Sequence, residues 1–445
     1  TATAAPYGVV GNAYSATLAS TCSTVPLPWT VSSGAVPGGL IFDGATGAVT
    51  GTPAPAAAGN STVVFAGKDS TGKTETCAVL FVVHPRTDRV SVDTNGFSVT
   101  GATNREPSIS KNNGRFIAFT SSAPLIPGVT GQQIYMHDRQ TGQPSLVSRD
   151  NSAALVWGNA SSSTPSISAD GRFVAFVSTA TNLVPVVVSG PQIYLRDTVG
   201  NVTSLVSQDN SGGLVAGNAS SSTPSISGDG KFVAFVSSST NLVAEVVAGT
   251  VSHIYVRDTQ TNQTSLVSRD NSVGPVPGNE SSSAPSISGD GKLVAFVSTA
   301  TNLVPVVVSA PQIYLRDVVG NITSLVSRDN SVGPVPGDKS GSAPSISGDG
   351  KLVAFVSTAT NLLGPAGLPV VAEQQAYVRD TLMNQTRLVS QDNFGGLVPV
   401  PGNGPSSTPS ISADGQFVAF VSSAPNLVIS PASAAAFDVY VRALP

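Results

Sequence analysis

The sequence predicts an all-β fold, because short runs of β-branched and aromatic residues alternate with turn-forming residues along most of its 445 residues. The tetrapeptide Pro-Ser-Ile-Ser occurs six times, at spacings of 58, 59, 61, 59 and 65 residues. Such a period indicates a supersecondary unit copied in tandem, in which each copy buries its apolar face against its neighbours. Six strand-rich units of this length favour a ring, so we expect a six-bladed β-propeller.

Each repeat predicts four antiparallel strands, and the third copy shows them most clearly. Its strands are expected at residues 222–227, 232–237, 254–258 and 265–268. Asp229-Gly230 joins the first two, and Asp-Gly between apolar runs is a strong hairpin signal. The run Phe-Val-Ala-Phe-Val does not alternate with polar residues, so both faces of the second strand should be covered. The blades are expected to begin near residues 104, 162, 221, 282, 341 and 406.

The two ends of the array predict how the ring closes. The sixth copy contains only three strands before the sequence ends, and residues 90–93 (Val-Ser-Val-Asp) match the fourth-strand pattern of residues 147–150. We therefore expect residues 89–93 to form the outer strand of the last blade, which would hide an unpaired edge. The alternative is an open row of units with a frayed first strand. The predicted domains are residues 1–85 and 86–445.

The repeated segments at residues 168–178 and 192–197, and again at 288–298 and 312–317, resemble the WD-like β-propeller repeat of the TolB propeller domain. The resemblance covers roughly residues 88–445. It implies the propeller fold. It also implies a binding scaffold, although related propellers serve as accessory domains of peptidases.

Residues 1–85 carry a different pattern. Gly39–Asp43, Val49–Pro53 and Asp69–Gly72, followed by an alternating strand, resemble the Ig-like domain family of bacterial surface proteins. The resemblance implies a small β-sandwich that acts as a spacer or an adhesive unit.

The only two cysteines, Cys22 and Cys77, both lie in this first region. They predict one disulfide bond and an oxidising compartment, and the alternative is a pair of buried free thiols.

Composition narrows the classes of partner. The formal net charge is −4 and no basic stripe is present, which argues against nucleic acid. No apolar run is long enough to predict a membrane span. Charged residues make up 11%, against about 25% in ordinary soluble domains. This low charged fraction fits an ordinary secreted propeller whose surface Ser and Thr side chains are hydrated. It also fits a surface that packs against other copies. We expect a secreted, extracellular or cell-surface location, with the periplasm as an alternative.

Long loops with aliphatic residues mark one face of the predicted propeller as a contact surface. They connect the second and third strands of two repeats, and the fourth strand to the next repeat. The candidate contact residues are Val186, Val187, Val188, Val306, Val307, Val308, Pro275, Pro277, Pro334 and Pro336. The alternative is that these loops pack on one another as a self-contained rim.

Two repeated polar pairs have structural explanations. Asp-Asn after the fourth strand (for example Asp209-Asn210) could supply calcium ligands, but one carboxylate per loop favours turn chemistry. Arg-Asp at the end of the third strand (for example Arg257-Asp258) predicts ion pairs and hydrogen bonds between blades.

No catalytic motif is present, and the three histidines fall in separate elements. We therefore expect no enzyme, no catalytic residues, no metal and no cofactor.

These features predict a non-catalytic surface scaffold that contacts proteins or other copies of itself, for example in a filament or layer. A second hypothesis is a module that binds a peptide or glycan at the channel mouth. A propeller hydrolase or lyase is a third hypothesis.

Overall fold

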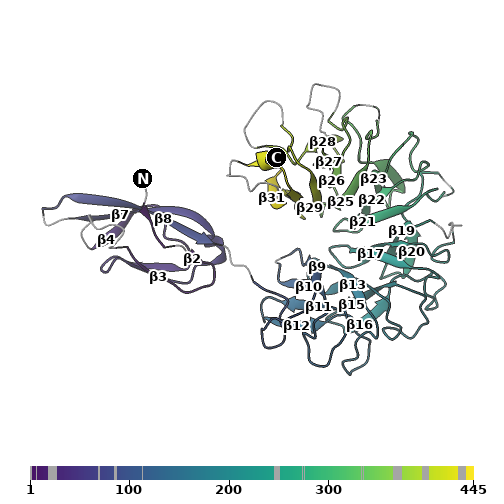
Figure 1. Ribbon diagram of the computed structural model, residues 1–445, viewed down its shortest axis with the longest axis horizontal. Helices are drawn as coiled ribbons and strands as arrows, with labels where there is room; N and C mark the ends of the chain where they lie inside the picture. Colours follow the sequence, from purple (N-terminus) through teal and green to yellow (C-terminus); the bar gives the residue numbers. More distant parts are fainter. Residues whose placement is uncertain are drawn as a thin grey trace. The chain divides into compact units, whose positions relative to one another are not determined.

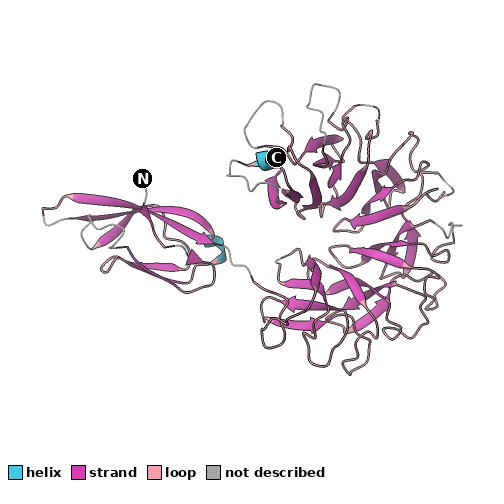
Figure 2. Cartoon of the chain, in the orientation of Figure 1, coloured by secondary structure: helices cyan, strands magenta, loops and turns pink. Residues whose placement is uncertain are grey.

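The structure is a computed structural model that describes residues 3–6, 8–18, 28–68, 71–84, 88–112, 114–244, 251–272, 274, 276–331, 333, 335–363, 373–392, 400–428 and 437–444. The chain divides into two compact units, Thr1–Arg89 and Val90–Pro445. The described residues form strands, turns and loops, apart from two short 3-10 helices, Pro55–Ala57 and Pro425–Leu427 (Figure 2). In this part of the chain, no helix is long and apolar enough to cross a membrane.

The first unit contains two sheets. One has the order β1 (Thr3–Ala4), β8 (Thr74–His84), β7 (Gly59–Lys68) and β4 (Trp29–Ser33), and β2 (Gly8–Val9) also pairs with β8. The other has the order β3 (Tyr14–Thr17), β6 (Ala48–Gly51) and β5 (Leu40–Asp43). Both contribute to one buried cluster that contains Trp29, Phe65 and Phe81.

Cys77 in β8 packs against this core. Cys22 lies outside the described residues, so the disulfide between the two cysteines stays a prediction.

The second unit consists of six consecutive antiparallel sheets in the described residues. The first sheet comprises β9 (Asn104–Ile109), β10 (Phe116–Ser121), β11 (Gln133–Asp138) and β12 (Gln143–Leu146). The second comprises β13 (Ser162–Ile167), β14 (Phe173–Ser178), β15 (Gln192–Asp197) and β16 (Val202–Leu205). The third comprises β17 (Ser221–Ile226), β18 (Phe232–Ser237), β19 (His253–Asp258) and β20 (Gln263–Leu266).

The fourth sheet comprises β21 (Ser282–Ile287), β22 (Leu293–Ser298), β23 (Gln312–Asp317) and β24 (Ile322–Leu325). The fifth comprises β25 (Gly341–Ile346), β26 (Leu352–Ser357), β27 (Gln375–Asp380) and β28 (Gln385–Leu388). The sixth has three described strands, β29 (Ser406–Ile411), β30 (Phe417–Ser422) and β31 (Asp438–Ala443). Within this unit, the sheets fan around a common centre with their first strands innermost (Figure 1).

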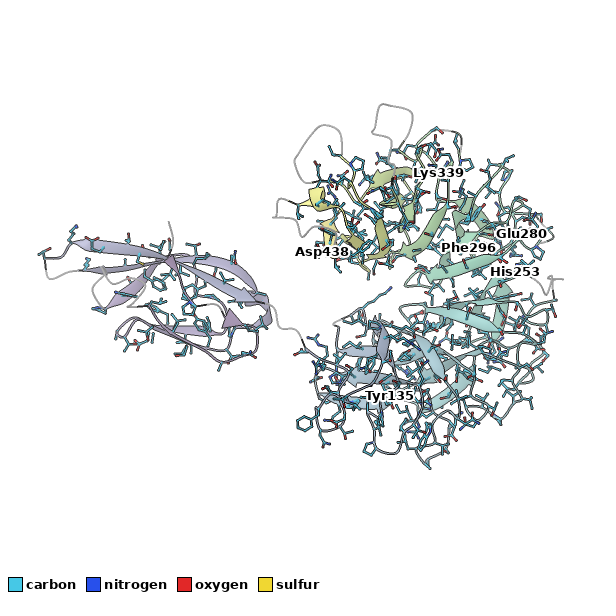
Figure 3. The ribbon with its side chains drawn as sticks, viewed as in Figure 1. Tyr135, His253, Glu280, Phe296, Lys339 and Asp438 are labelled. Carbon is cyan, nitrogen blue, oxygen red and sulfur yellow. The ribbon has the colours of Figure 1, made fainter. Side chains whose placement is uncertain are left out.

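The second strand of each inner sheet does not alternate apolar with polar residues, because neighbouring sheets cover both of its faces. In β14, Val174 and Phe176 pack against the first sheet, while Ala175 and Val177 pack against the third. In all six sheets a phenylalanine of the second strand stacks on a tyrosine of the third. Phe296 and Tyr314 are an example, with ring centroids 5.7 Å apart. Phe296 and Tyr135, from the fourth and first sheets, are labelled in Figure 3.

The Asp-Gly turn serves the packing of neighbouring sheets as well as the hairpin. Gly230 has a φ of +74°, and a Cβ there would lie 2.3 Å from Cδ2 of Phe173 in the preceding sheet. Any larger residue would therefore meet both backbone strain and a steric clash. Asp229 accepts the hydroxyl hydrogen of Ser227 over 2.6 Å.

The Pro-Ser-Ile-Ser motif links consecutive innermost strands. The backbone N–H of Ile226 donates to Oγ of Ser166 in the preceding sheet over 3.1 Å, and the same bond occurs at all five junctions. The second serine of the motif, Ser227, accepts the N–H of Phe232 over 3.0 Å and so fixes the following turn. The motif thus recurs because each serine satisfies a backbone group.

The predicted closing strand at residues 89–93 is wrong. These residues form no strand, and Asp93 instead accepts the N–H groups of Asn95 and Phe97, each over 2.9 Å. Val90 packs against the buried face of the first sheet that contains Ile117 and Phe119. No buried cluster of the described residues joins that face to another sheet, and the packing of Val90 there buries apolar surface that would otherwise meet water.

The described ring is consequently open between its last and first sheets. Buried clusters join each sheet to the next from the first to the sixth, but none of those in the described residues joins the sixth to the first. Strand β31 lies at the edge of its sheet.

Candidate functional site

The two valine-rich loops, which contain residues 186–188 and 306–308, each present one highly exposed valine. Val187 and Val307 occupy equivalent positions in the second and fourth sheets, and 90% and 92% of their surfaces are exposed. The neighbouring residues are more enclosed: Val186 and Val306 are half-buried against the cores of their sheets, Val188 is half-buried, and Val308 is buried.

The proline loops lie where the fourth strand ends. Pro277 and Pro336 are half-buried and form isolated β-bridges with Arg269 and Arg328. Pro275 and Pro334 lie outside the described residues.

The Asp-Asn pairs join consecutive sheets. Asp209 accepts the N–H of Ser211 over 3.1 Å, which is local turn chemistry. Asn210 reaches the next sheet, where it accepts the N–H of Thr264 over 2.6 Å and donates to its carbonyl over 2.8 Å. Asn151, Asn271 and Asn330 make the same pair of bonds to Thr203, Thr323 and Thr386. We call these four pairs the asparagine clamps.

An arginine of the third strand reinforces each clamp. The Nη1 group of Arg257 donates to the carbonyl of Asp209 over 3.1 Å and to Oγ1 of Thr264 over 2.9 Å. The predicted hydrogen bonds between sheets are therefore present.

The predicted ion pairs of these arginines with aspartates are absent among the described residues. Asp197, next to Arg196, instead pairs with Arg172 of its own sheet over 2.7 Å. The strand geometry explains this, because adjacent residues of a strand point to opposite faces.

Burial and neighbouring arginines lower the pKa of three of these arginines. Burial, and next the nearby Arg149, lower the pKa of Arg196 to about 10. Burial and Arg269 do the same for Arg316, and burial and Arg328 for Arg379, again to about 10. At three junctions, therefore, two arginines from adjacent sheets lie close together.

The last sheet exposes an apolar surface that its counterparts bury. We call this surface, formed by Phe417, Ala419, Val421, Val439 and Val441, the open face. Val439 and Val441 are 75% and 66% exposed. The equivalent residues of the second sheet, Ile193 and Leu195, are buried against the third sheet. Val418 and Phe420, on the opposite side, are buried against the fifth sheet.

No group of three or more His, Cys, Asp or Glu side chains suited to a metal ion occurs within the described residues. His137 and His253 are buried in separate sheets, and burial lowers the pKa of His253.

The sequence interpretation missed both the open face and the arginine pairs. The open face could be found only from the structure, because it depends on the ring being open. The arginine pairs left a signal in the sequence. The residue three positions after the fourth strand is Arg149, Gln208, Arg269, Arg328 or Gln391 in successive repeats. The variation between arginine and glutamine identifies the junctions that hold two arginines.

Comparison with known proteins found similarity to one family and to several solved structures. Residues 1–83 match the family described as "Putative Ig domain". The second unit has β-propeller structures among its structural neighbours. One is the β-propeller domain of the Trilobed protease from Pyrococcus furiosus, at 11% identity and a TM-score of 0.35, covering 78% of this chain and 94% of that one. The comparison with curated proteins found no match.

Two further similar structures are a peptidase and a hydrolase. A puromycin-hydrolysing peptidase from Mycobacterium tuberculosis is 14% identical with a TM-score of 0.41, covering 94% of this chain and 53% of that one. A puromycin hydrolase is 11% identical with a TM-score of 0.37, covering 92% of this chain and 52% of that one. This chain thus spans about half the length of each of these two proteins.

These two structures correct the expectation that the chain is not an enzyme. That expectation came from the near-identity of the repeats and from the lack of converging reactive groups. Hydrolases occur among the proteins similar to this chain, and a shared fold does not separate binding scaffolds from enzymes. The exclusion of catalysis is therefore withdrawn.

Proposed function

We propose that this protein is a secreted, cell-surface scaffold that contacts proteins and associates with copies of itself. The observation that carries the proposal is the open face. Five junctions in the same chain bury the equivalent surface against a sheet of closely similar sequence. A surface of this kind, left exposed, favours association with a matching surface.

A second copy of this chain suits the open face because β31 also presents an unpaired edge. Two β31 strands paired antiparallel around Tyr440 would place Val439 of one copy opposite Val441 of the other. This arrangement is isologous, and it would satisfy the free backbone groups of both edges. Asp438, which begins β31, is labelled in Figure 3.

We further propose an architecture for the two units. We take the six sheets as the blades of one propeller of the TolB-like kind, and residues 1–83 as a β-sandwich that acts as a spacer or adhesive unit. The charged fraction of 11% supports a surface that packs against other copies, in a filament or layer.

Replacing both exposed valines of β31 with lysine (Val439→Lys, Val441→Lys) tests the proposal. Because lysine on an edge strand opposes strand pairing, the variant should associate about tenfold more weakly or more than the wild type. Sedimentation equilibrium over a range of concentrations measures this.

The matched control is Val187→Lys with Val307→Lys, which charges two even more exposed valines elsewhere. That variant should associate like the wild type. A wild-type protein that stays monomeric at high concentration would contradict the proposal. Weaker self-association of the control variant, with that of the β31 variant unchanged, would contradict it too.

A further inference from the structure

A cavity of about 310 Å³ lies between the fourth and fifth sheets. One wall is aliphatic and comes from the loop Val304–Val306 and from Leu325 and Val326 of the fourth sheet. The other wall is polar, and the residues that line it are Arg328, Arg379, Thr381 and Asn384. The cavity is distinct from the open face of the last sheet.

Two arginines, Arg328 and Arg379, line this cavity from the two sides of the junction. Arg379 is only 2% exposed, and its Nη1 donates to the carbonyl of Asp329 over 3.1 Å and to Oγ1 of Thr386 over 2.8 Å. Its Nη2 is buried and has no hydrogen-bond partner among the described residues. A buried N–H of a charged group without an acceptor is costly, so the site favours a ligand that supplies one.

Asn384 explains why this donor is free. In the second sheet, the equivalent Asn201 accepts from Nη2 of Arg196 over 3.0 Å. In the fourth sheet, Asn321 accepts from both Arg316 and Arg269, over 3.1 and 2.5 Å.

In the fifth sheet, Asn384 accepts from Nη2 of Arg328 over 2.6 Å. Asn384 makes no such bond to Arg379. Within the described residues, this is the only one of the three junctions that combines paired arginines, a free buried Nη2 and the aliphatic cavity.

We propose that this cavity binds a carboxylate side chain of a peptide, together with an aliphatic residue next to it. The carboxylate accepts hydrogen bonds from Arg328 and Arg379. It also offsets the charge of two guanidinium groups that form no salt bridge with a carboxylate of the described residues. The aliphatic neighbour packs on Val304, Pro305 and Val306.

The walls favour a peptide over an acidic sugar. A sugar ring needs hydrogen-bond partners for its hydroxyl groups, but five of the ten lining residues are Val, Leu or Pro. None of the lining residues is aromatic. An Asp or Glu beside a Val or Leu matches both walls.

The test uses the full chain and the peptide acetyl-Val-Glu-Val-amide, with acetyl-Val-Gln-Val-amide as the neutral counterpart. Binding is measured by calorimetric titration at low salt. The Glu peptide should bind about tenfold more tightly than the Gln peptide, because charge-assisted hydrogen bonds to paired arginines are lost with the carboxylate.

Arg328→Gln should remove most of that preference. This substitution places at residue 328 the side chain that the chain itself carries at Gln208 and Gln391, so the fold accommodates it. The matched control is Arg269→Gln, because Asn321 at that junction already accepts hydrogen bonds from both arginines. This variant should bind the peptides like the wild type.

Equal binding of the two peptides, no binding of either, or equal losses in Arg328→Gln and Arg269→Gln would overturn the proposal. Stronger binding of glucuronate or inorganic phosphate than of the Glu peptide would overturn it too. Arg328→Gln should leave self-association unchanged, and the β31 variant should leave peptide binding unchanged, so the two proposals fail separately.

Discussion

Arginine and lysine at one repeated position make different contacts. Arg115 and Arg172 each hold the aspartate that ends the third strand of their own sheet. In the third, fourth and fifth sheets the position is Lys231, Lys292 or Lys351, which pairs with the aspartate of the Asp-Gly turn. The planar guanidinium reaches a carboxylate with two parallel bonds, whereas the ammonium acts as a point charge.

The Arg115–Asp138 pair predicts a pH-dependent contribution to stability. Hydrogen bonding to Arg115 is the largest cause that lowers the pKa of Asp138 to about 2. A folded pKa below the unfolded value stabilises the protein above about pH 4, and this is lost as the pH falls towards 2. Asp138→Asn should therefore lower the free energy of unfolding by about 1 kcal/mol at pH 7, allowing for solvent screening, and by much less near pH 2.

Urea unfolding at both pH values measures this difference. Asp258→Asn is the control, because Asp258 accepts the same type of turn N–H but Lys231 pairs elsewhere. A loss for Asp138→Asn that does not change with pH, or that equals the loss for Asp258→Asn, would rule out the ion pair as its cause.

At the scale of elements, the four asparagine clamps hold the fourth strands of the second to fifth sheets to the loop of the preceding sheet. Asn210 satisfies both backbone groups of Thr264, and Arg257 donates to the same loop. These bonds cross the interface between two sheets, as do the serine bonds between the innermost strands, and unlike the apolar contacts there they have a direction. The clamps therefore fix the register of one sheet on the next.

Asn210→Ala should lower the free energy of unfolding by about 2 kcal/mol, because it leaves the N–H and carbonyl of Thr264 without partners. Ser211→Ala is the control, since its hydroxyl bonds only within the exposed loop, and it should cost less than about 0.5 kcal/mol. Chemical denaturation compares the two. Equal losses would show that the clamp contributes no more than the local turn.

At the scale of the whole molecule, an open ring makes the last sheet less stable than those inside. Strands β18 and β30 have the same sequence, Phe-Val-Ala-Phe-Val-Ser. Neighbouring sheets cover both faces of β18, whereas β30 is covered on one face. In a tandem array, terminal units lack one stabilising interface and open more often.

Hydrogen exchange measured by mass spectrometry should therefore show β30 exchanging about tenfold faster than β18 or more. The identical sequences remove differences in intrinsic exchange within the strands. The β31 lysine variant provides the comparison without self-association. Equal protection of β18 and β30 in that variant would mean that the ring closes in solution.

The repeated local units could be predicted from the amino-acid sequence. Period, Asp-Gly turns and non-alternating apolar runs predicted the repeated strands, because turn chemistry and two-sided burial act over a few residues. Only the tertiary structure decided how the ring ends, since residues 90–93 fit a strand pattern yet pack on the first sheet. The free donor of Arg379 likewise depends on which arginine Asn384 accepts from, and those partners lie about fifty residues apart. Contacts between distant segments compete with one another, and a local pattern cannot rank them.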